Sequence, residues 1–352
     1  MDSKIKKLLD LNSLPGKMIS LYQPTTRIGD QRDLLIYKNL VKSVEGLLDN
    51  DSANNTEKTR ESLKNLQRDS NFWQYRTEGL AMFVKGDQRL VFDLNQSVKE
   101  SATVKDLPFL VPLIEATQIA EDHFVLDISK DRFQLWYSNG VRLFPIEEDV
   151  AKSFSELFDD LDSDADVNYG SYRGKIPTYH GYRAKPEEDE KNKEKYFRYM
   201  DNQLSTYFKN HDLKVLLGGT TENIADWKNR ATSQYYLDQD LGKPVGDFSD
   251  QELLNFTNDL FAQRFEKEAS KKLERLQAAL ANERASTNLT EIQQKLSERN
   301  VEDLIVGYSY SDAQTTQVDE LVLNALEVGA NVIVLPRKFE DQKRMIAARF
   351  RY

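Results

Sequence analysis

The sequence has no cysteine and only three histidines among its 352 residues. Without cysteine the chain forms no disulfide, has no thiolate nucleophile and lacks any cysteine-ligated zinc or iron–sulfur site. The histidines, His123, His180 and His211, are far apart in the sequence, which argues against a histidine metal centre. These absences exclude many classes of enzyme, and we expect no cofactor.

Long apolar runs are also missing. The run from Leu107 to Ile114 is interrupted by Pro108 and Pro112, and it is far shorter than the roughly 20 residues that a membrane helix needs. The opening residues, MDSKIKKLLDLNSLPG, lack the apolar core of a signal peptide. We therefore expect a soluble, cytoplasmic protein with no membrane partner.

Acidic residues outnumber basic ones by 58 to 48, which gives a net charge of −10. This balance argues against a protein that coats nucleic acid with its whole surface, but it allows one local basic patch. At roughly 100–200 residues per domain, the length suggests two or three domains. A hydrophobic content of 39% is that of a globular protein.

The first part of the chain has the pattern of an α/β domain, which we place at residues 1–118. Residues 18–24 have strand composition, and residues 79–84 and 89–94 predict a hairpin with Gly86 in the turn. Residues 56–69 predict a polar helix. A preceding helix is indicated by one apolar stripe, formed by Leu34, Tyr37, Val41, Val44 and Leu48.

Residues 119–248 predict a second α/β domain. Three short strands, at 123–129, 132–137 and 141–146, form a meander with Asn139-Gly140 as one turn. A helix is predicted from Pro186, and residues 213–219 read as a buried strand that precedes a helix capped by Thr220. The first helix carries an apolar residue every fourth position, at Tyr196, Met200, Leu204 and Phe208.

Residues 249–352 predict a third domain. Ser249 and Glu252 form a capping box, and the helix that they open is predicted to run to about Ala285. A strand at 303–308, a helix at 318–329 and a strand at 331–336 imply a parallel pair joined by a crossover. The last residues predict a helical turn and an edge strand. The fold class is thus mixed α/β, with three consecutive α/β domains.

The most unusual segment is a basic loop at residues 168–185, which reads NYGSYRGKIPTYHGYRAK. Residues 167–185 contain four bases and no acid, a net charge of +4, whereas residues 147–166 carry −8. Bases attract phosphates, tyrosines offer stacking faces, and glycines allow close approach of the backbone. This mixture is typical of a contact with irregular or single-stranded RNA. The alternative is a surface loop whose bases balance the acidic run.

Other candidate sites are weaker. Asp127, at the end of a strand, lies where nucleases with a ribonuclease-H-like sheet place a metal carboxylate, but no partner set is evident. The acidic run lacks the pattern of a calcium loop. Gly218-Gly219-Thr220 resembles a phosphate cradle only weakly. Near the C-terminus, residues 337–351 form a second basic stretch whose alternative is an ordinary solvated surface.

The order of these pieces resembles a known family. HFVLDISKDRFQLWY, KIPTYHGYRAKPEEDEKNKEKYFRYMDNQL and LKVLLGGTTENIADW resemble the central domain of the archaeal–eukaryotic class-1 translation release factors and Pelota. The ending, VDELVLNALEVGANVIVLP before AARFRY, resembles the C-terminal domain of the bacterial branch of that family. The resemblance implies a ribonuclease-H-like central domain with a basic loop and a C-terminal domain like L30e/L7Ae.

The catalytic signature of the family, Gly-Gly-Gln, is absent from the whole sequence. The resemblance therefore implies a ribosome-associated protein that binds rRNA in the A site, for rescue, recycling or dormancy, without releasing peptide. A translational GTPase is an implied partner. The residues that we expect to contact RNA lie in one segment: Arg173, Lys175, Tyr179, His180, Gly181, Tyr182, Arg183 and Lys185.

Two other functions stay open. In the first, the chain is an enzyme: either a divergent peptidyl-tRNA hydrolase that uses His180, or a metal-dependent nuclease that uses Asp127 with acids from residues 147–166. In the second it is a protein-interaction scaffold that binds no RNA, which the net charge of −10 favours.

Overall fold

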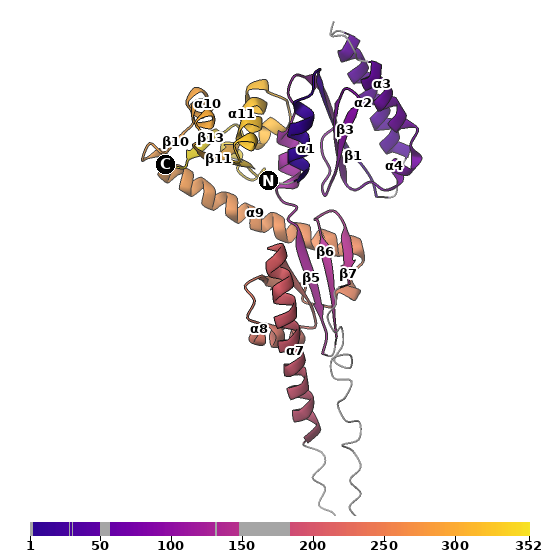
Figure 1. Ribbon diagram of the computed structural model, residues 1–352, viewed down its shortest axis with the longest axis vertical. Coiled ribbons are helices and arrows are strands. Elements are labelled where there is room, and N and C mark those ends of the chain that lie inside the picture. The colour runs from indigo at the N-terminus through magenta and orange to yellow at the C-terminus, as the bar shows by residue number, and fades with distance from the viewer. Residues whose placement is uncertain (1–2, 28, 30, 50–56, 131, 148–183) are drawn as a thin grey trace, which may run out of the picture. The chain divides into compact units, whose positions relative to one another are not determined.

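The computed structural model describes residues 3–27, 29, 31–49, 57–130, 132–147 and 184–352. It is a mixed α/β structure with three separate sheets (Figure 1). The chain divides into two compact units, one formed by residues 1–121 together with 258–352 and the other by residues 122–257. The predicted mixed α/β class with three α/β parts agrees with the three sheets.

The N-terminal segment builds a four-stranded antiparallel sheet in the order β3-β2-β1-β4. Its elements are α1 (Ser3–Asn12), β1 (Met18–Pro24), α2 (Gln31–Asp49), α3 (Glu57–Gln67), α4 (Ser70–Gln74), β2 (Gly79–Lys85), β3 (Gln88–Leu94), β4 (Ser101–Lys105) and α5 (Val111–Thr117). The hairpin is confirmed, and Gly86 has φ of +64° in its turn. Helix α1 and strand β4 were not among the predicted elements.

Strand β1 is buried on both faces, which explains its continuous apolar composition. Ile19 and Leu21 pack with α2 in one hydrophobic cluster, whereas Met18 and Tyr22 belong to a second cluster on the opposite face. Because successive side chains of a strand alternate between faces, both layers need apolar residues. The predicted helical stripe is confirmed, since Tyr37, Val41, Val44 and Leu48 are buried on α2, although Leu34 is only partly buried.

The unit of residues 122–257 contains a five-stranded sheet in the order β7-β6-β5-β8-β9. Its elements are β5 (His123–Ile128), β6 (Phe133–Ser138), β7 (Leu143–Ile146), α7 (Ala184–His211), β8 (Lys214–Gly219), α8 (Thr221–Arg230), β9 (Tyr236–Asp240) and the short helix η1 (Val245–Asp247). The meander β5–β6–β7 is antiparallel, as predicted, while β8 and β9 are parallel to β5. Helices α7 and α8 pack on one face of this sheet.

Helix α9 (Asp250–Leu280) begins at the predicted capping box. The backbone N–H and hydroxyl of Ser249 both donate to Glu252, and the Ser249 hydroxyl accepts from the Glu252 backbone N–H at 3.3 Å. The helix ends at Leu280, earlier than the predicted end near Ala285, because Glu283 takes a φ of +57° and β10 (Ala285–Ser286) follows.

The C-terminal segment forms a sheet in the order β10-β13-β11-β12. Its elements are α10 (Leu289–Ser297), β11 (Val301–Val306), η2 (Tyr308–Ser311), α11 (Thr316–Glu327), β12 (Asn331–Val334), η3 (Glu340–Gln342) and β13 (Ile346–Phe350). The parallel β11–β12 pair is confirmed. The expectation of an edge strand at the end of the chain is wrong, because β13 lies between β10 and β11. No helix in the described part of the chain combines the length and apolar composition that a membrane span requires.

Candidate functional site

The predicted RNA-contacting residues fall almost entirely outside the described residues. Arg173, Lys175, Tyr179, His180, Gly181, Tyr182 and Arg183 all belong to the stretch 148–183, which lies outside the described residues. Lys185 belongs to the first turn of α7, and its side chain is likewise not described. The structure does describe the two elements on either side of this stretch, β7 before it and α7 after it.

The segment begins after β7 and ends at the start of α7. Strand β7 is antiparallel to β6, which is antiparallel to β5, so Ile146 and Ile128 end their strands toward the same edge of the sheet. Gly219 ends β8 at that edge as well, because β8 is parallel to β5. The carboxyl edge of the sheet is where open α/β sheets carry their binding loops.

Helix α7 is long compared with the sheet that it covers. Its 28 residues span about 42 Å at 1.5 Å per residue, whereas a six-residue strand spans about 20 Å. The predicted apolar positions Tyr196, Met200, Leu204 and Phe208 are completely buried against the sheet. The preceding residues, AKPEEDEKNKEK, are almost all polar, and Figure 1 shows this part of α7 continuing beyond the strands and α8. We call residues 184–195 the stem of α7.

Helix α8 holds the stem through charged contacts. Lys193, which is 5% exposed, donates a hydrogen bond to Asp226 and lies 5.5 Å from the centre of the Phe197 ring. Arg230 bonds Glu190 at 2.5 Å and approaches Glu194 at 3.5 Å. Because the exposed pairs contribute only about 0.2–1 kcal/mol each, we expect the part-buried Lys193–Asp226 pair to be the main contact.

A second polar cluster fixes the middle of α7. The carboxylate of Asp201, 4% exposed, accepts hydrogen bonds from the backbone N–H of Thr232 at 2.9 Å and from its hydroxyl at 3.1 Å. The Tyr236 hydroxyl donates to the other Asp201 oxygen at 2.9 Å. Burial and the neighbouring carboxylate raise the pKa of Tyr236 well above its usual value, so it remains a donor. This cluster ties α7 to β9, and the sequence carried no recognisable signal for it.

Asp127 has a structural role. Its carboxylate accepts a hydrogen bond from the backbone N–H of Val245 at 3.0 Å, and burial raises its pKa. Among the described residues, no group of three or more His, Asp or Glu side chains is arranged to hold a metal ion. Asp127 thus anchors the segment that leads into α9, and no metal carboxylate set surrounds it in the described part of the chain.

Neighbouring chain segments lie so close to Gly218 and Gly219 that neither position has room for a Cβ atom. A Cβ at Gly218 would lie 2.8 Å from the Val245 side chain, and one at Gly219 would lie 2.4 Å from the Ile128 carbonyl oxygen. The N–H of Gly219 is already bonded to the Lys243 carbonyl at 3.1 Å. The pair therefore lets neighbouring chain segments approach the sheet, and it leaves no open phosphate cradle at Gly219.

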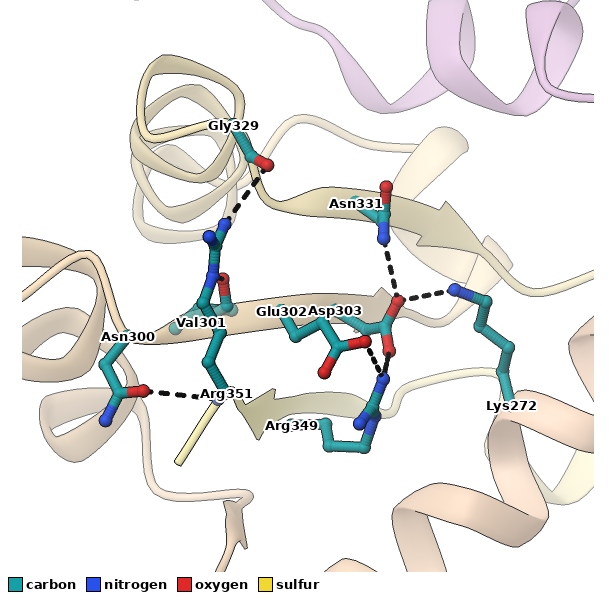
Figure 2. Close-up of polar contacts among 9 residues, drawn as sticks. All are labelled: Lys272, Asn300, Val301, Glu302, Asp303, Gly329, Asn331, Arg349 and Arg351. Carbon is teal, nitrogen blue, oxygen red and sulfur yellow. Dashed lines mark hydrogen bonds and ion pairs between the residues drawn. The ribbon is translucent and has the colours of Figure 1, made fainter.

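The C-terminal basic stretch is largely paired with acids. Arg349 bonds both Asp303, at 2.6 and 2.9 Å, and Glu302, at 2.6 Å, while Arg351 donates to the carbonyl oxygens of Val301 and Gly329 (Figure 2). Three of the other four bases have acidic neighbours, in the pairs Arg337–Glu115, Lys338–Glu266 and Lys343–Glu340. This arrangement favours the reading of an ordinary surface over that of a nucleic-acid patch.

Asp303 is the centre of this C-terminal cluster. Its side chain is 2% exposed and accepts hydrogen bonds from Lys272 at 2.6 Å, from Arg349 and from Asn331 at 3.2 Å (Figure 2). These donors come from α9, β13 and β12, so one carboxylate joins three elements to β11. An acid at the start of an apolar strand was the only sequence signal for it.

One protein-family model matches part of this chain. The model of bacterial archaeo-eukaryotic release factor family 8 matches residues 120–269. A comparison with curated proteins finds no match.

Three solved structures are similar to this chain at low identity. The archaeal translation termination factor aRF1 is 14% identical, with 99% of this chain and 97% of that one covered and a TM-score of 0.25. Archaeoglobus fulgidus Pelota is 15% identical, with 78% and 79% covered and a TM-score of 0.34. Dom34 of S. cerevisiae is 10% identical, with 100% and 93% covered and a TM-score of 0.36. The resemblance seen in the sequence is confirmed by the match to bacterial archaeo-eukaryotic release factor family 8, which covers residues 120–269 of the 352 in the chain.

Proposed function

We propose that this chain is a ribosome-associated, release-factor-like protein that enters a vacant A site as a tRNA-shaped body. It would act in ribosome rescue, recycling or dormancy without catalysing peptide release. The family match over residues 120–269 is the observation that carries this proposal. The absence of Gly-Gly-Gln from the sequence supports binding without hydrolysis.

The RNA contact that we propose is the segment ending in the stem of α7. Four bases, Arg173, Lys175, Arg183 and Lys185, would bind rRNA phosphates, because phosphate contacts dominate affinity for nucleic acid. Tyr179, His180 and Tyr182 would stack or hydrogen-bond, and Gly181 would allow the close approach. The clamped stem supports this assignment, since it begins beyond the core of its unit at the carboxyl edge of the sheet.

We propose three domains, at residues 1–118, 119–248 and 249–352. The order β7-β6-β5-β8-β9, with a meander followed by two parallel strands, supports a ribonuclease-H-like central domain. The parallel β11–β12 pair with its α11 crossover supports an L30e-like third domain. The first domain would face the decoding site and the third a protein partner, with a translational GTPase as our proposal. The cytoplasm follows as the site of action.

The test is co-sedimentation of the purified chain with vacant 70S ribosomes and with separated subunits across a salt series. We expect salt-sensitive binding to 70S particles. Changing Arg173, Lys175, Arg183 and Lys185 together to glutamate should abolish binding, and a milder change to alanine should reduce the log–log salt slope by about 3. Unchanged affinity and slope in both variants would overturn the loop assignment.

A matched control changes four exposed bases elsewhere to glutamate, so that the total charge changes equally: Lys209, Lys267, Lys271 and Arg275. This variant should bind as the native chain does. If it loses binding as fully as the loop variant, net charge and not the loop governs the interaction. Absence of native binding at low salt would refute the A-site proposal itself.

An enzymatic function is tested by the same particles loaded with peptidyl-tRNA. We expect no peptide release by the native chain. Turnover that disappears in a His180→Ala variant would replace our proposal with a divergent hydrolase. Nuclease activity abolished by Asp127→Asn would favour the metal-dependent alternative, although Asp127 already serves to bind the Val245 N–H.

A further inference from the structure

The two chain segments of the larger unit, residues 1–121 and 258–352, share one hydrophobic core. The cluster that contains Tyr22, Leu110 and Leu113 from the first segment continues without a break into Val318 and Val322 from the second. Helix α5 lies at this joint, where it contacts both η2 and β12. A joint of this kind separates only when buried apolar surface is exposed to water.

Polar contacts cross the joint at its margins. The side-chain amide of Gln118 donates to the Val334 carbonyl at 2.6 Å, and its oxygen accepts from the Val334 N–H at 2.9 Å. This pair of hydrogen bonds covers the edge of β12 as a neighbouring strand would. On the same interface Arg337 approaches Glu115 at 3.4 Å. All of these contacts are lost if the two segments part.

Within the joint lies a carboxylate that is almost completely removed from water. Asp319, in the first turns of α11, is 1% exposed, and neither of its oxygens has a hydrogen-bond partner among the described residues. A buried, unpaired charge is costly, whereas a protonated carboxyl group costs far less. The closed joint therefore favours the protonated form of Asp319.

The groups that face Asp319 come from both segments. Tyr22 on β1 is completely buried and donates its hydroxyl hydrogen to the Phe109 carbonyl, so it adds no donor for Asp319. Lys105 on β4, the Leu110 N–H and the Gln314 side chain each favour the charged form, but their combined effect is smaller than that of burial. Glu115, the other acid of the joint, also has its pKa raised by burial.

We propose that the joint between residues 1–121 and 258–352 is proton-controlled, with Asp319 protonated while the joint is closed and ionised when it opens. Opening hydrates the carboxylate and frees the edge of β12 from Gln118. This inference is independent of the proposed ribosome contact, because it concerns only contacts inside one unit.

The sign and size of the effect follow from linkage. Burial, as the largest cause, raises the pKa of Asp319 from 3.8 to about 7. The closed form binds the proton more tightly than the open form does. Protonation therefore stabilises closure fully at a pH below the open-form pKa, and this stabilisation is lost as the pH rises to 7. With a pKa of 3.8 in the open form and about 7 in the closed form, ionisation of Asp319 raises the opening constant about 90-fold between pH 5 and pH 8, and little further above pH 8.

Native-state hydrogen exchange of the full chain tests this directly. The opening constant is measured at the amides of α5 and at Val334 from pH 5 to pH 8, after division by the intrinsic exchange rate. We expect the opening constant to rise about 90-fold in the native chain. In Asp319→Asn the side chain cannot ionise, so this rise should almost disappear. The control Asp341→Asn, an exposed acid of the same segment, should behave as the native chain does.

An equal pH dependence in native and Asp319→Asn chains would overturn the proposal. So would a flat native profile. If the variant fails to fold, the carboxyl carbon of Asp319 is titrated by NMR in the native chain. A midpoint near 7 supports the proposal, and a midpoint near 4 refutes it.

Discussion

Replacing Asp303 with asparagine removes the centre of the buried ionic cluster in the C-terminal segment. The substitution keeps the size of the side chain but leaves Lys272 and Arg349 without their common counter-ion. Removing one partner of a buried ion pair costs about 3–5 kcal/mol of the free energy of unfolding. Arg349 retains Glu302 at 2.6 Å, and Lys272 is 17% exposed, so we expect a loss near the lower limit, about 3 kcal/mol.

The pH dependence of this loss has a definite sign. Burial alone would raise the pKa of Asp303, but the hydrogen bonds from Lys272 and Arg349 outweigh it, and the pKa lies below 3.8 in the folded chain. The stabilisation is therefore complete above the unfolded-state value and is lost as the pH falls through the folded-state value. The difference between native and Asp303→Asn chains should be constant near neutral pH and should shrink below pH 3.8.

Hydrogen exchange at the amides of β11 and β13 measures the free energy of opening where the cluster lies. The neighbouring variant Glu302→Gln is the matched control, because Glu302 also pairs with Arg349 but is 44% exposed. The control should cost less than about 1 kcal/mol. If Asp303→Asn costs no more than Glu302→Gln, burial of the cluster is not what makes it stabilising, and our reasoning is wrong.

Two further substitutions test packing and the stem. In Gly307→Ala the new Cβ would lie 2.3 Å from the Lys343 carbonyl oxygen, so urea unfolding should show that the free energy of unfolding falls by more than about 2 kcal/mol. In the control Gly46→Ala the new Cβ has no neighbour within 4 Å, so this change should be neutral or stabilising by under about 1 kcal/mol. In Arg230→Ala the stem loses its bond to Glu190, so amide exchange in the stem should accelerate while global stability falls by less than about 1 kcal/mol. Unchanged exchange in the stem would show that Arg230 does not hold it.

The parts of the fold that the sequence predicted well are those with a strong local pattern. The four-residue spacing from Tyr196 to Phe208 gave the buried face of α7, and Ser249 with Glu252 gave the start of α9. Asn139-Gly140 marked a turn in which Gly140 has a φ of +74°. Each of these signals arises from residues that are neighbours in the sequence.

The strands that we did not predict from the sequence have no strong local pattern. Strands β4 (SATVK) and β9 (YLDQD) are short and polar, and they form because a buried strand offers them an edge to pair with. The central position of β13 depends on β10, a two-residue strand that pairs with Arg349 and Ala348 from more than 60 positions away. No local pattern specifies a pairing of that kind.

The charge of a local stretch of sequence is a poor guide to the charge of the folded surface. The last residues of the chain looked like a basic patch, yet Arg349 is paired with Asp303, which lies 46 positions earlier, and Asp303 also binds Lys272, 31 positions before it. A run of bases is therefore a surface patch only if no distant acid folds against it. The same reservation applies to the four bases between Arg173 and Lys185, whose own run contains no acid but follows a strongly acidic one. Charge reversal judged against the equally charged control separates these cases, because a base already paired with an acid contributes little to the salt dependence of RNA binding.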